Sequence, residues 1–374
     1  MGDSAKQRLE GAARAVRTHD WWLYKIPPLF AVACAQIVLY SMDPGTGLLL
    51  LFATVFVSLC TAAAFGYAIN DWCDAAQDAR VGKASPMAGL SLPARLGVVA
   101  APVALGFAPA FLPGYGPLAT MLLVLQFAVP AAYSAPPLRL KERGIAGVVA
   151  DAAGAHVIPT LFILAVFAHA AGGPTRTALV FGAAAVLFQG AAGVKGILCH
   201  QDRDRDRDLE AGVRTLAASV SHEKILRVLR LYCYPLEMAG LTAMVLVLAG
   251  AAPLLALAYV VHGAMELLKL AIGWRVRLGS DNVPYLPFVN NFFPELAMPM
   301  ALALSCVGVH AAYAVLPVAF VLLFRPNVAN QAAETRRLFL ALEERWQKVR
   351  RRTGELARAF WKRFVRRGRP GVSG

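Results

Sequence analysis

Long apolar blocks, separated by short polar stretches, constrain the fold of this chain more than any other feature. Of its 374 residues, 58% are hydrophobic and only 16% are charged, whereas soluble domains carry about a quarter charged residues. A helix needs about 20 mostly apolar residues to cross a bilayer core of about 30 Å. The sequence therefore predicts an all-α, polytopic membrane helical bundle.

Nine segments satisfy this length rule and predict about nine transmembrane helices. They lie at 21–42, 46–69, 94–112, 115–134, 145–170, 177–199, 226–249, 252–274 and 294–324. Together they form one membrane domain, 21–324, between a polar N-terminal segment, 1–20, and a basic C-terminal tail, 325–374. Hydropathy alone sets these boundaries.

The loops between the segments fall into two sets that differ in charge. The loops at 43–47, 112–115 and 171–176 are nearly free of cations, whereas the others carry most of the loop Lys and Arg residues. Because Lys and Arg are enriched in short cytoplasmic loops, we expect the basic loops and the N-terminus to face the cytoplasm. This orientation suits an integral protein of a bacterial plasma membrane.

The net charge of +14 is concentrated in the tail. From Arg325 onward there are 14 Lys or Arg residues against 4 Glu, which accounts for +10 of the total. On a hydrophobic protein such a tail is expected to meet anionic membrane lipids rather than nucleic acid. Its apolar residues recur at helical spacing, which favours an amphipathic helix on a membrane surface over a frayed, solvated tail.

The side of the membrane on which the tail lies is left open by the sequence. Nine crossings that start in the cytoplasm place the tail outside, against the charge rule. The conflict disappears if the last segment, 294–324, does not cross simply, because its 31 residues are long for one span.

An acidic motif ends the second apolar segment. Asn70, Asp74 and Asp78 are spaced at i, i+4 and i+8, so a helix places them on one face, with Asp71 beside them. Crowded carboxylates repel one another, and a cation relieves that repulsion. Hard oxygen ligands suit Mg²⁺, which commonly uses one or two carboxylates together with substrate phosphates.

A second acidic run follows the sixth segment. Residues 202–208 alternate Asp and Arg, and Asp204 and Asp208 are one helical turn apart. Taken alone, such a run is typical of a solvated, self-neutralising loop. Both acidic runs, however, end even-numbered segments, so the topology places them at the same membrane face, where two helices can present facing carboxylates.

A third polar segment ends the fourth apolar block at that face. Residues 133–141 read YSAPPLRLK, in which the two prolines stop the helix. Arg139 and Lys141 are cations available to a diphosphate.

These three segments together resemble the UbiA superfamily of intramembrane prenyltransferases. The family motif NDxxDxxxD is matched by Asn70, Asp71, Asp74 and Asp78, and its DxxxD–GxxTL motif by Asp204 and Asp208 with 212–216. The segment at 133–141 is similar to that of chlorophyll synthases, homogentisate prenyltransferases and archaeal-type lipid prenyltransferases. The segment 83–89 is a degenerate form of the family's RPxxxG element, and the tail has no counterpart in the family pattern.

The resemblance implies Mg²⁺-dependent transfer of a prenyl group from a prenyl diphosphate to a hydrophobic aromatic or lipid acceptor, by an intramembrane prenyltransferase domain at 21–324. It implies that five aspartates hold the metal and are catalytic: Asp71, Asp74, Asp78, Asp204 and Asp208. Substrate contacts are expected from Asn70, Lys83, Tyr133, Arg139, Lys141, Asp151 and Lys195.

Asp151 and Lys195 join this set because ionisable residues inside apolar segments are costly and often functional. Asp151 would orient or deprotonate the acceptor, whereas Lys195 has the simpler role of reaching the lipid headgroups. Three other functions stay open at this point: cyclisation of the prenyl chain, phosphoribosyl transfer on the same scaffold, and ion-coupled transport. Transport is disfavoured because transporter ion sites lie near the bilayer midplane.

Overall fold

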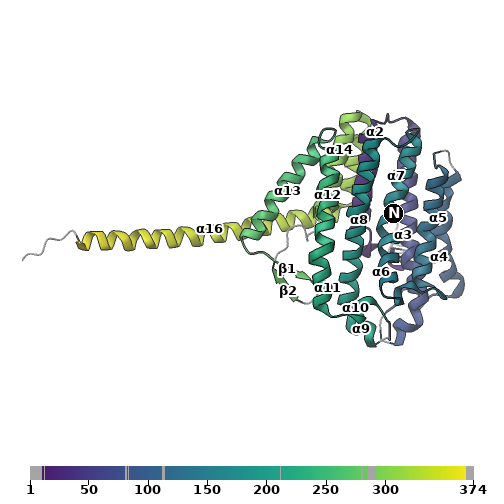
Figure 1. Ribbon diagram of the computed structural model, residues 1–374, viewed down its shortest axis with the longest axis horizontal. Coiled ribbons are helices and arrows are strands. Elements are labelled where there is room, and N and C mark those ends of the chain that lie inside the picture. Colours follow the sequence, from purple (N-terminus) through teal and green to yellow (C-terminus); the bar gives the residue numbers. More distant parts are fainter. Residues whose placement is uncertain are drawn as a thin grey trace, which may run out of the picture.

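The computed structural model describes residues 11, 13–80, 82, 84–111, 114–210, 212–278, 281–284 and 292–367. Most of them form a bundle of roughly parallel and antiparallel helices, and one long helix leaves it (Figure 1). The α-helices are α2 (Ile26–Tyr40), α3 (Thr46–Arg80), α4 (Leu92–Phe107), α5 (Pro117–Ser134), α6 (Ile145–Ala152), α7 (Ile158–Ala170), α8 (Arg176–Arg203), α9 (Arg205–Glu210), α10 (Leu216–Ser219), α11 (His222–Val228), α12 (Tyr234–Leu248), α13 (Pro253–Ala271), α14 (Met298–Val309), α15 (Val315–Leu323) and α16 (Arg325–Arg367).

Short irregular elements connect or extend these helices. The 3₁₀ turns are η1 (Thr18–Asp20), η2 (Ala108–Phe111), η3 (Leu140–Glu142) and η7 (Ala311–Ala314), and the π-helical turns are η4 (Ala153–Val157), η5 (Leu229–Cys233) and η6 (Phe293–Ala297). The strands β1 (Arg275–Leu278) and β2 (Asp281–Pro284) form an antiparallel hairpin with Val276 opposite Val283. Each π turn lies within a longer helical run, so α6 continues into α7 and α11 into α12.

Seven of the helical runs in the described residues are long and apolar enough to cross a bilayer. They coincide with the predicted segments from 46–69 to 252–274, which confirms the all-α membrane bundle. The first predicted segment, 21–42, contains the 15-residue helix α2, which is short for a complete span. Every residue of α2 from Ile26 to Val38 is buried, as expected for a helix that is apolar on all sides.

The predicted ninth span, 294–324, is wrong as a single crossing. It consists of a first helix, Phe293–Val309, and a second, Ala311–Leu323, which are separated at His310, where the backbone is extended. Tyr313 donates to the carbonyl of Met42, just after α2 ends, whereas Trp22, just before α2 begins, donates to the carbonyl of Leu323. The second helix therefore runs back along α2 to the end where α2 starts.

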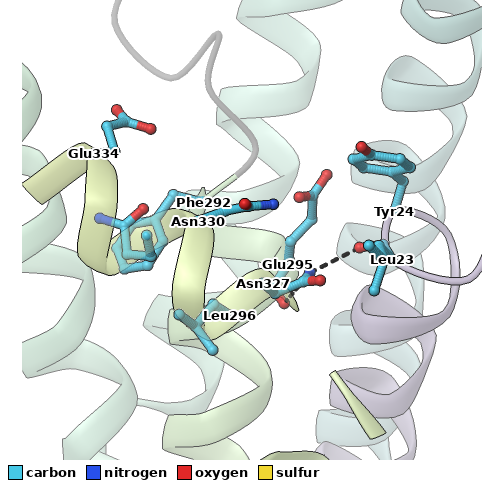
Figure 2. Close-up of a pocket in the computed structure, with 9 residues that line it drawn as sticks. Leu23, Tyr24, Phe292, Glu295, Leu296, Asn327, Asn330 and Glu334 are labelled. Atoms are coloured by element: carbon cyan, nitrogen blue, oxygen red, sulfur yellow. Dashed lines mark hydrogen bonds between the residues drawn. The ribbon is translucent and has the colours of Figure 1, made fainter. Parts of the chain in front are cut away.

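This return places the start of the tail at the N-terminal end of α2. The Asn327 amide donates to the carbonyls of Leu23 and Glu295, at 2.8 and 3.3 Å (Figure 2). Leu23 precedes α2 and Glu295 lies in η6, before α14, so α16 begins where those two helices begin. Of the two possibilities that the sequence left open for the tail, the structure agrees with the one in which 294–324 does not cross simply, because this segment folds into a hairpin.

Helices α8 and α12 pack closely because a glycine lies between them. A Cβ atom added at Gly240 of α12 would lie 2.5 Å from the backbone nitrogen of Phe188 and 2.9 Å from the carbonyl oxygen of Ala184 on α8. No side chain fits at such distances from backbone atoms. The small residue therefore sets the spacing of two helices, one of which ends in the second acidic run.

We expect Gly240→Ala to lower the thermal stability of the purified protein, because the extra methyl group forces α8 and α12 apart, at a cost of about 1–3 kcal/mol. Gly263→Ala is the matched control, since Gly263 lies inside α13 and no atom would meet its added Cβ within 4 Å. The midpoint of thermal unfolding in detergent, measured for both variants, checks this. Equal midpoints for the two variants would contradict the packing argument.

Candidate active site

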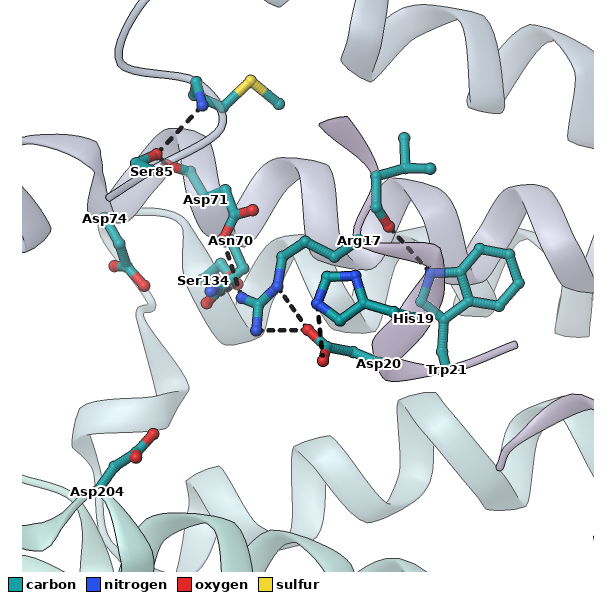
Figure 3. Close-up of polar contacts among 12 residues, drawn as sticks. Arg17, His19, Asp20, Trp21, Asn70, Asp71, Asp74, Ser85, Ser134 and Asp204 are labelled. Carbon is teal, nitrogen blue, oxygen red and sulfur yellow. Dashed lines mark hydrogen bonds and ion pairs between the residues drawn. The ribbon is translucent and has the colours of Figure 1, made fainter. Parts of the chain in front are cut away.

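The first acidic motif lies at the end of α3, which continues beyond the apolar block as far as Arg80. Asp71 is buried, with 2% of its surface exposed, and its carboxylate forms an ion pair with the Arg17 guanidinium at 3.2 Å. Arg17 also pairs with Asp20 at 2.6 Å (Figure 3). Its guanidinium lies over the ring of Tyr67. The N-terminal segment thus contacts the motif through one arginine.

Asp74, one turn further along α3, is paired with cations from the segment that follows α5. The Lys141 ammonium and the Arg139 guanidinium both donate to its carboxylate, the latter at 3.1 Å. Lys141 and Ser134 also donate to the side-chain oxygen of Asn70, at 3.2 and 3.3 Å. The predicted acidic motif and the predicted cationic segment therefore lie directly against each other.

The conformation of the segment after α5 explains how its cations reach α3. Helix α5 ends at Ser134, one residue before the two prolines, as predicted. Arg139 has a φ of 38°, in the left-handed region, and the short turn η3 follows it. This sharp change of direction points both Arg139 and Lys141 back toward Asp74, and Glu142 holds Arg139 in place at 2.6 Å.

The two cations differ in how firmly they keep their charge. Burial lowers the pKa of Lys141 from its ordinary value, although Asp74 works in the opposite direction. Burial also acts against the charge of Arg139, but Glu142 and Asp74 outweigh it and raise the pKa of that guanidinium. Lys141 is therefore the partly dehydrated cation of the pair, whose charge depends on an anion beside it.

The second acidic run forms a compact turn after α8. Asp204 follows the last residue of α8, and the amide of Asp208 donates to the carbonyl of Asp204 at 2.9 Å, as in one helical turn. The Thr215 hydroxyl donates to the Asp208 carboxylate at 3.0 Å and also caps α10. Gly212 has a φ of 72°, which permits the reversal that brings Thr215 to Asp208.

The structure separates the aspartates of this repeated run by their partners. Asp202 pairs with Arg205 at 2.7 Å and with His222 at 2.6 Å, and so fastens the start of α11 to the end of α8. Asp206 is exposed on α9. The ion pairs of Asp204, with His200 and Arg207, are longer, at 3.7 and 3.9 Å.

The two acidic runs converge near Tyr133. The phenol of Tyr133, on the last turn of α5, lies within electrostatic range of Asp74, Asp208 and Asp151. Figure 3 shows Asp74 and Asp204 on separate helices, with both carboxylates turned toward the space between them. Both runs thus lie at the same end of the bundle, as the topology argument predicted.

Deeper in the bundle, a second polar group adjoins the aspartates. Asp151 on α6 lies within electrostatic range of Lys25, whose ammonium lies 5.4 Å from the ring centre of Tyr67. His156 lies in the π turn η4, next to Gln189 of α8 at 3.4 Å. Such π turns often occur at functional sites.

Two predicted substrate contacts have other outcomes. Lys195 does not extend toward headgroups in this structure, because it forms an ion pair with Glu237 of α12 at 2.6 Å. Lys83 lies outside the described residues.

Sequence reasoning missed Arg17 and Lys25. Both stand in stretches that match no motif, and only the folded chain brings them to Asp71 and to Asp151. Arg17 is a single cation in a polar N-terminal segment, which gives no signal from which such a contact could be found. Lys25 lies in the predicted span 21–42, where the rule for ionisable residues inside apolar segments could have singled it out.

The carboxylates provide hard oxygen donors, but they do not form a closed metal cage. In the described part of the chain, no three His, Cys, Asp or Glu side chains come close enough together to hold a metal ion. This donor set fits a metal that takes one or two carboxylates from each side and completes its coordination with phosphate oxygens and water, as Mg²⁺ does.

A comparison with protein families matches residues 28–292 to the UbiA prenyltransferase family. The chain belongs to this family. The match begins within α2, ends directly before η6, and leaves out η6, α14, η7, α15 and α16. It confirms the resemblance derived from the aspartate motifs and makes this UbiA-family chain an integral membrane protein of the prenyltransferase class.

Solved structures show the same fold. A UbiA homolog from Archaeoglobus fulgidus bound to GPP and Mg²⁺ is 17% identical, with a TM-score of 0.50 over 81% of this chain and 99% of the homolog. The homolog bound to DMAPP and Mg²⁺ gives 17% identity and the same TM-score over 82% and 99%. A comparison with curated protein sequences gives no match.

We expect Asp202→Asn to destabilise the protein by about 1–2 kcal/mol, because it removes charge-assisted hydrogen bonds to Arg205 and His222 that are partly screened by solvent. Asp206→Asn, at an exposed position in the same run, should leave the unfolding midpoint unchanged. Thermal unfolding of both variants in detergent tests this. A loss of stability in Asp206→Asn alone would contradict the assignment of roles.

Proposed function

We propose that this protein transfers a prenyl group from a prenyl diphosphate to a hydrophobic aromatic or lipid acceptor and releases diphosphate, with Mg²⁺ as the cofactor. The observation that carries the proposal is the convergence of two acidic runs, from α3 and α8, with Arg139 and Lys141 at one end of an apolar bundle. Family membership and the relatives that bind GPP or DMAPP with Mg²⁺ support it.

The aspartates would hold the cofactor from two sides. Asp71, Asp74 and Asp78 would act from α3, and Asp204 and Asp208 from the turn after α8. When bound, Mg²⁺ neutralises the charge that develops on the departing diphosphate.

The basic residues beside Asp74 have the chemistry to bind the diphosphate itself. Arg139 offers a planar set of N–H donors that suits phosphate oxygens, and Lys141 offers a compact charge. Both cations now donate to Asp74, so a diphosphate would take over partners that already point into the site. Lys83 and Asn70 remain proposed contacts on the same side.

The acceptor would enter from the apolar interior beside Asp151. Asp151 would accept a proton from an acceptor hydroxyl or orient it, and Tyr133 lies within electrostatic range of both Asp151 and the acidic runs. The surrounding apolar helices exclude water from the electron-poor prenyl group, which protects it from hydrolysis. Lys195, already paired with Glu237, would act by holding α8 and α12 in place beside the bound acceptor.

We also propose that the site faces the cytoplasm of a plasma membrane. Arg17, the basic turn with Arg139 and Lys141, and the start of α16 lie on the side of the bundle that carries the aspartates, and Lys and Arg are enriched on the cytoplasmic side. Accessibility of a cysteine introduced at exposed Asp206 to a membrane-impermeant reagent, in inside-out and right-side-out vesicles, tests the orientation.

We expect Asp208→Asn to reduce prenyl transfer by at least about a hundredfold, because a neutral amide cannot supply the charge that holds the metal. Asp206→Asn is the matched control, since it makes the same chemical change two residues away on an exposed surface. Diphosphate release from GPP and from longer prenyl diphosphates, with and without Mg²⁺ and with panels of phenols, quinone precursors and glycerolipids, provides the measurement.

The outcomes of this assay separate the possible reactions. Mg²⁺-dependent diphosphate release that requires an acceptor supports prenyl transfer. Release without any acceptor would identify a cyclase or hydrolase, and turnover only with a phosphoribosyl donor would identify a phosphoribosyl transferase. Full activity in Asp208→Asn would sink the proposed site.

Lys141→Met should change two kinetic constants in opposite directions. The variant loses a charge-assisted contact to the diphosphate, so KM for the prenyl diphosphate should rise about tenfold or more. It also removes a competitor for the Asp74 carboxylate, so the Mg²⁺ concentration for half-maximal activity should fall. Lys141→Arg, which keeps the charge, should change both constants less. If both constants rise together in Lys141→Met, Lys141 does not compete with the metal.

A further inference from the structure

The last helix leaves the bundle crosswise. Between the helix Ala311–Leu323 and the following helix the chain bends by 71°. Figure 1 shows α16 extending away from the bundle, across the direction of α8 and α12. Since α8 and α12 belong to runs long enough to cross the bilayer, a helix at this angle extends along the membrane rather than through it.

Contacts along the first turns of α16 fix its level in the membrane. Glu334 forms an ion pair with Lys269, near the end of α13, at 2.6 Å. Arg345 donates to the carbonyl of Ala271, the last residue of α13, at 3.3 Å. Together with the contacts of Asn327, these place α16 where α13 ends and where α2 begins, the level at which we infer the boundary of the bilayer on the aspartate side.

An apolar stripe along α16 begins where the helix packs on the bundle and continues where the helix extends beyond the bundle. Leu338, between the two contacts with α13, is buried with 3% of its surface exposed. Because 18 residues make five helical turns, Leu356 lies on the same line of the helix, and it is 64% exposed. Val349 lies about 20° around the helix from this line and Trp346 about 80°, and they are 57% and 67% exposed. Leu338 is thus covered by the protein, whereas no part of the described chain covers Trp346, Val349 and Leu356 to the same extent.

Many of the exposed cations lie about 80° to 160° around the helix from this line, on the side away from Trp346. Arg337, Lys348, Arg351 and Arg358 are all exposed, and their spacing places them away from the stripe. From Arg325 to the end of the chain, 14 Lys and Arg residues face only 4 Glu. The helix therefore combines an apolar stripe containing tryptophan with a strongly basic face, the composition of helices that lie in a membrane interface.

We propose that α16 binds along the anionic lipid surface of the same bilayer, on the side of the aspartate runs. The apolar stripe would enter the boundary between headgroups and acyl chains, and the long cationic side chains would reach back to the lipid phosphates. A nucleic acid would bind the basic face but leave the stripe in water. A second copy would bring two strongly basic helices together, which electrostatic repulsion opposes.

The test is hydrogen–deuterium exchange of the full chain in lipid nanodiscs. One set contains only phosphatidylcholine, and the other adds phosphatidylglycerol. The amides between Phe339 and Trp361 should exchange about tenfold more slowly in the anionic nanodiscs, and high salt should remove most of that difference, because ions screen the attraction.

A matched pair of variants separates the stripe from the rest of the helix. Leu356→Glu places a charge on the stripe and should abolish the slow exchange. Leu340→Glu makes the same change at a residue that is also exposed, at 50%, but that lies about 160° around the helix from Leu356. This control should keep the slow exchange.

Three results would overturn the inference: equal exchange with and without anionic lipid, equal effects of the two glutamate variants, or protection that appears only at high protein concentration or with added RNA. The last two conditions identify a second copy or a nucleic acid as the occupant. The readout does not depend on prenyl transfer, so the lipid contact and the proposed reaction can fail separately.

Discussion

Compensation of buried carboxylate charge at the end of α3 is the interaction on which the site depends. An ionised carboxylate removed from water is costly unless a cation and hydrogen bonds accompany it. Asp71 is matched by Arg17 from the N-terminal segment, and Asp74 by Arg139 and Lys141 from the turn after α5. These pairs hold together three parts of the chain that are far apart in sequence.

The same charge matching gives the site its chemical character. In the reaction that we propose, the substrate and its metal supply charges of both signs. The metal ions would neutralise the aspartates, and the diphosphate would neutralise Arg139 and Lys141. Substrate binding would thus exchange internal ion pairs for pairs with the ligand, without leaving buried charges unmatched. The low pKa of Lys141, caused by burial, fits a cation that is most stable when an anion lies beside it.

The hairpin formed by the helices Phe293–Val309 and Ala311–Leu323 determines where α16 begins relative to α2 and the residues before it. Because the second of these helices returns along α2, the start of α16 lies at the same end as Leu23 and Arg17. The first turns of α16 belong to the bundle, since Asn327 and Glu334 bond to it. Arg17 and the start of α16 thus lie on the same side of the bundle as the aspartate runs, which is the side that the loop charges predict for the basic tail.

Much of the fold and part of the site follow from the sequence alone. The apolar blocks determined the helical membrane bundle because backbone groups in lipid must be satisfied within a helix, and seven of the predicted segments match helical runs. The aspartate motifs determined the family, since the carboxylates at fixed helical spacing are local properties of the chain. The prolines at 136 and 137 likewise set the end of α5.

Tertiary structure alone decided which charges meet. The pairing of Arg17 with Asp71, of Lys195 with Glu237 and of Glu334 with Lys269 joins residues 42 to 65 positions apart, and no local pattern encodes such distances. The break at His310 also escaped hydropathy, because a hairpin of two apolar helices and one long span have the same composition. Sequence fixes which segments avoid water, whereas only packing fixes how they turn and which buried charges become partners.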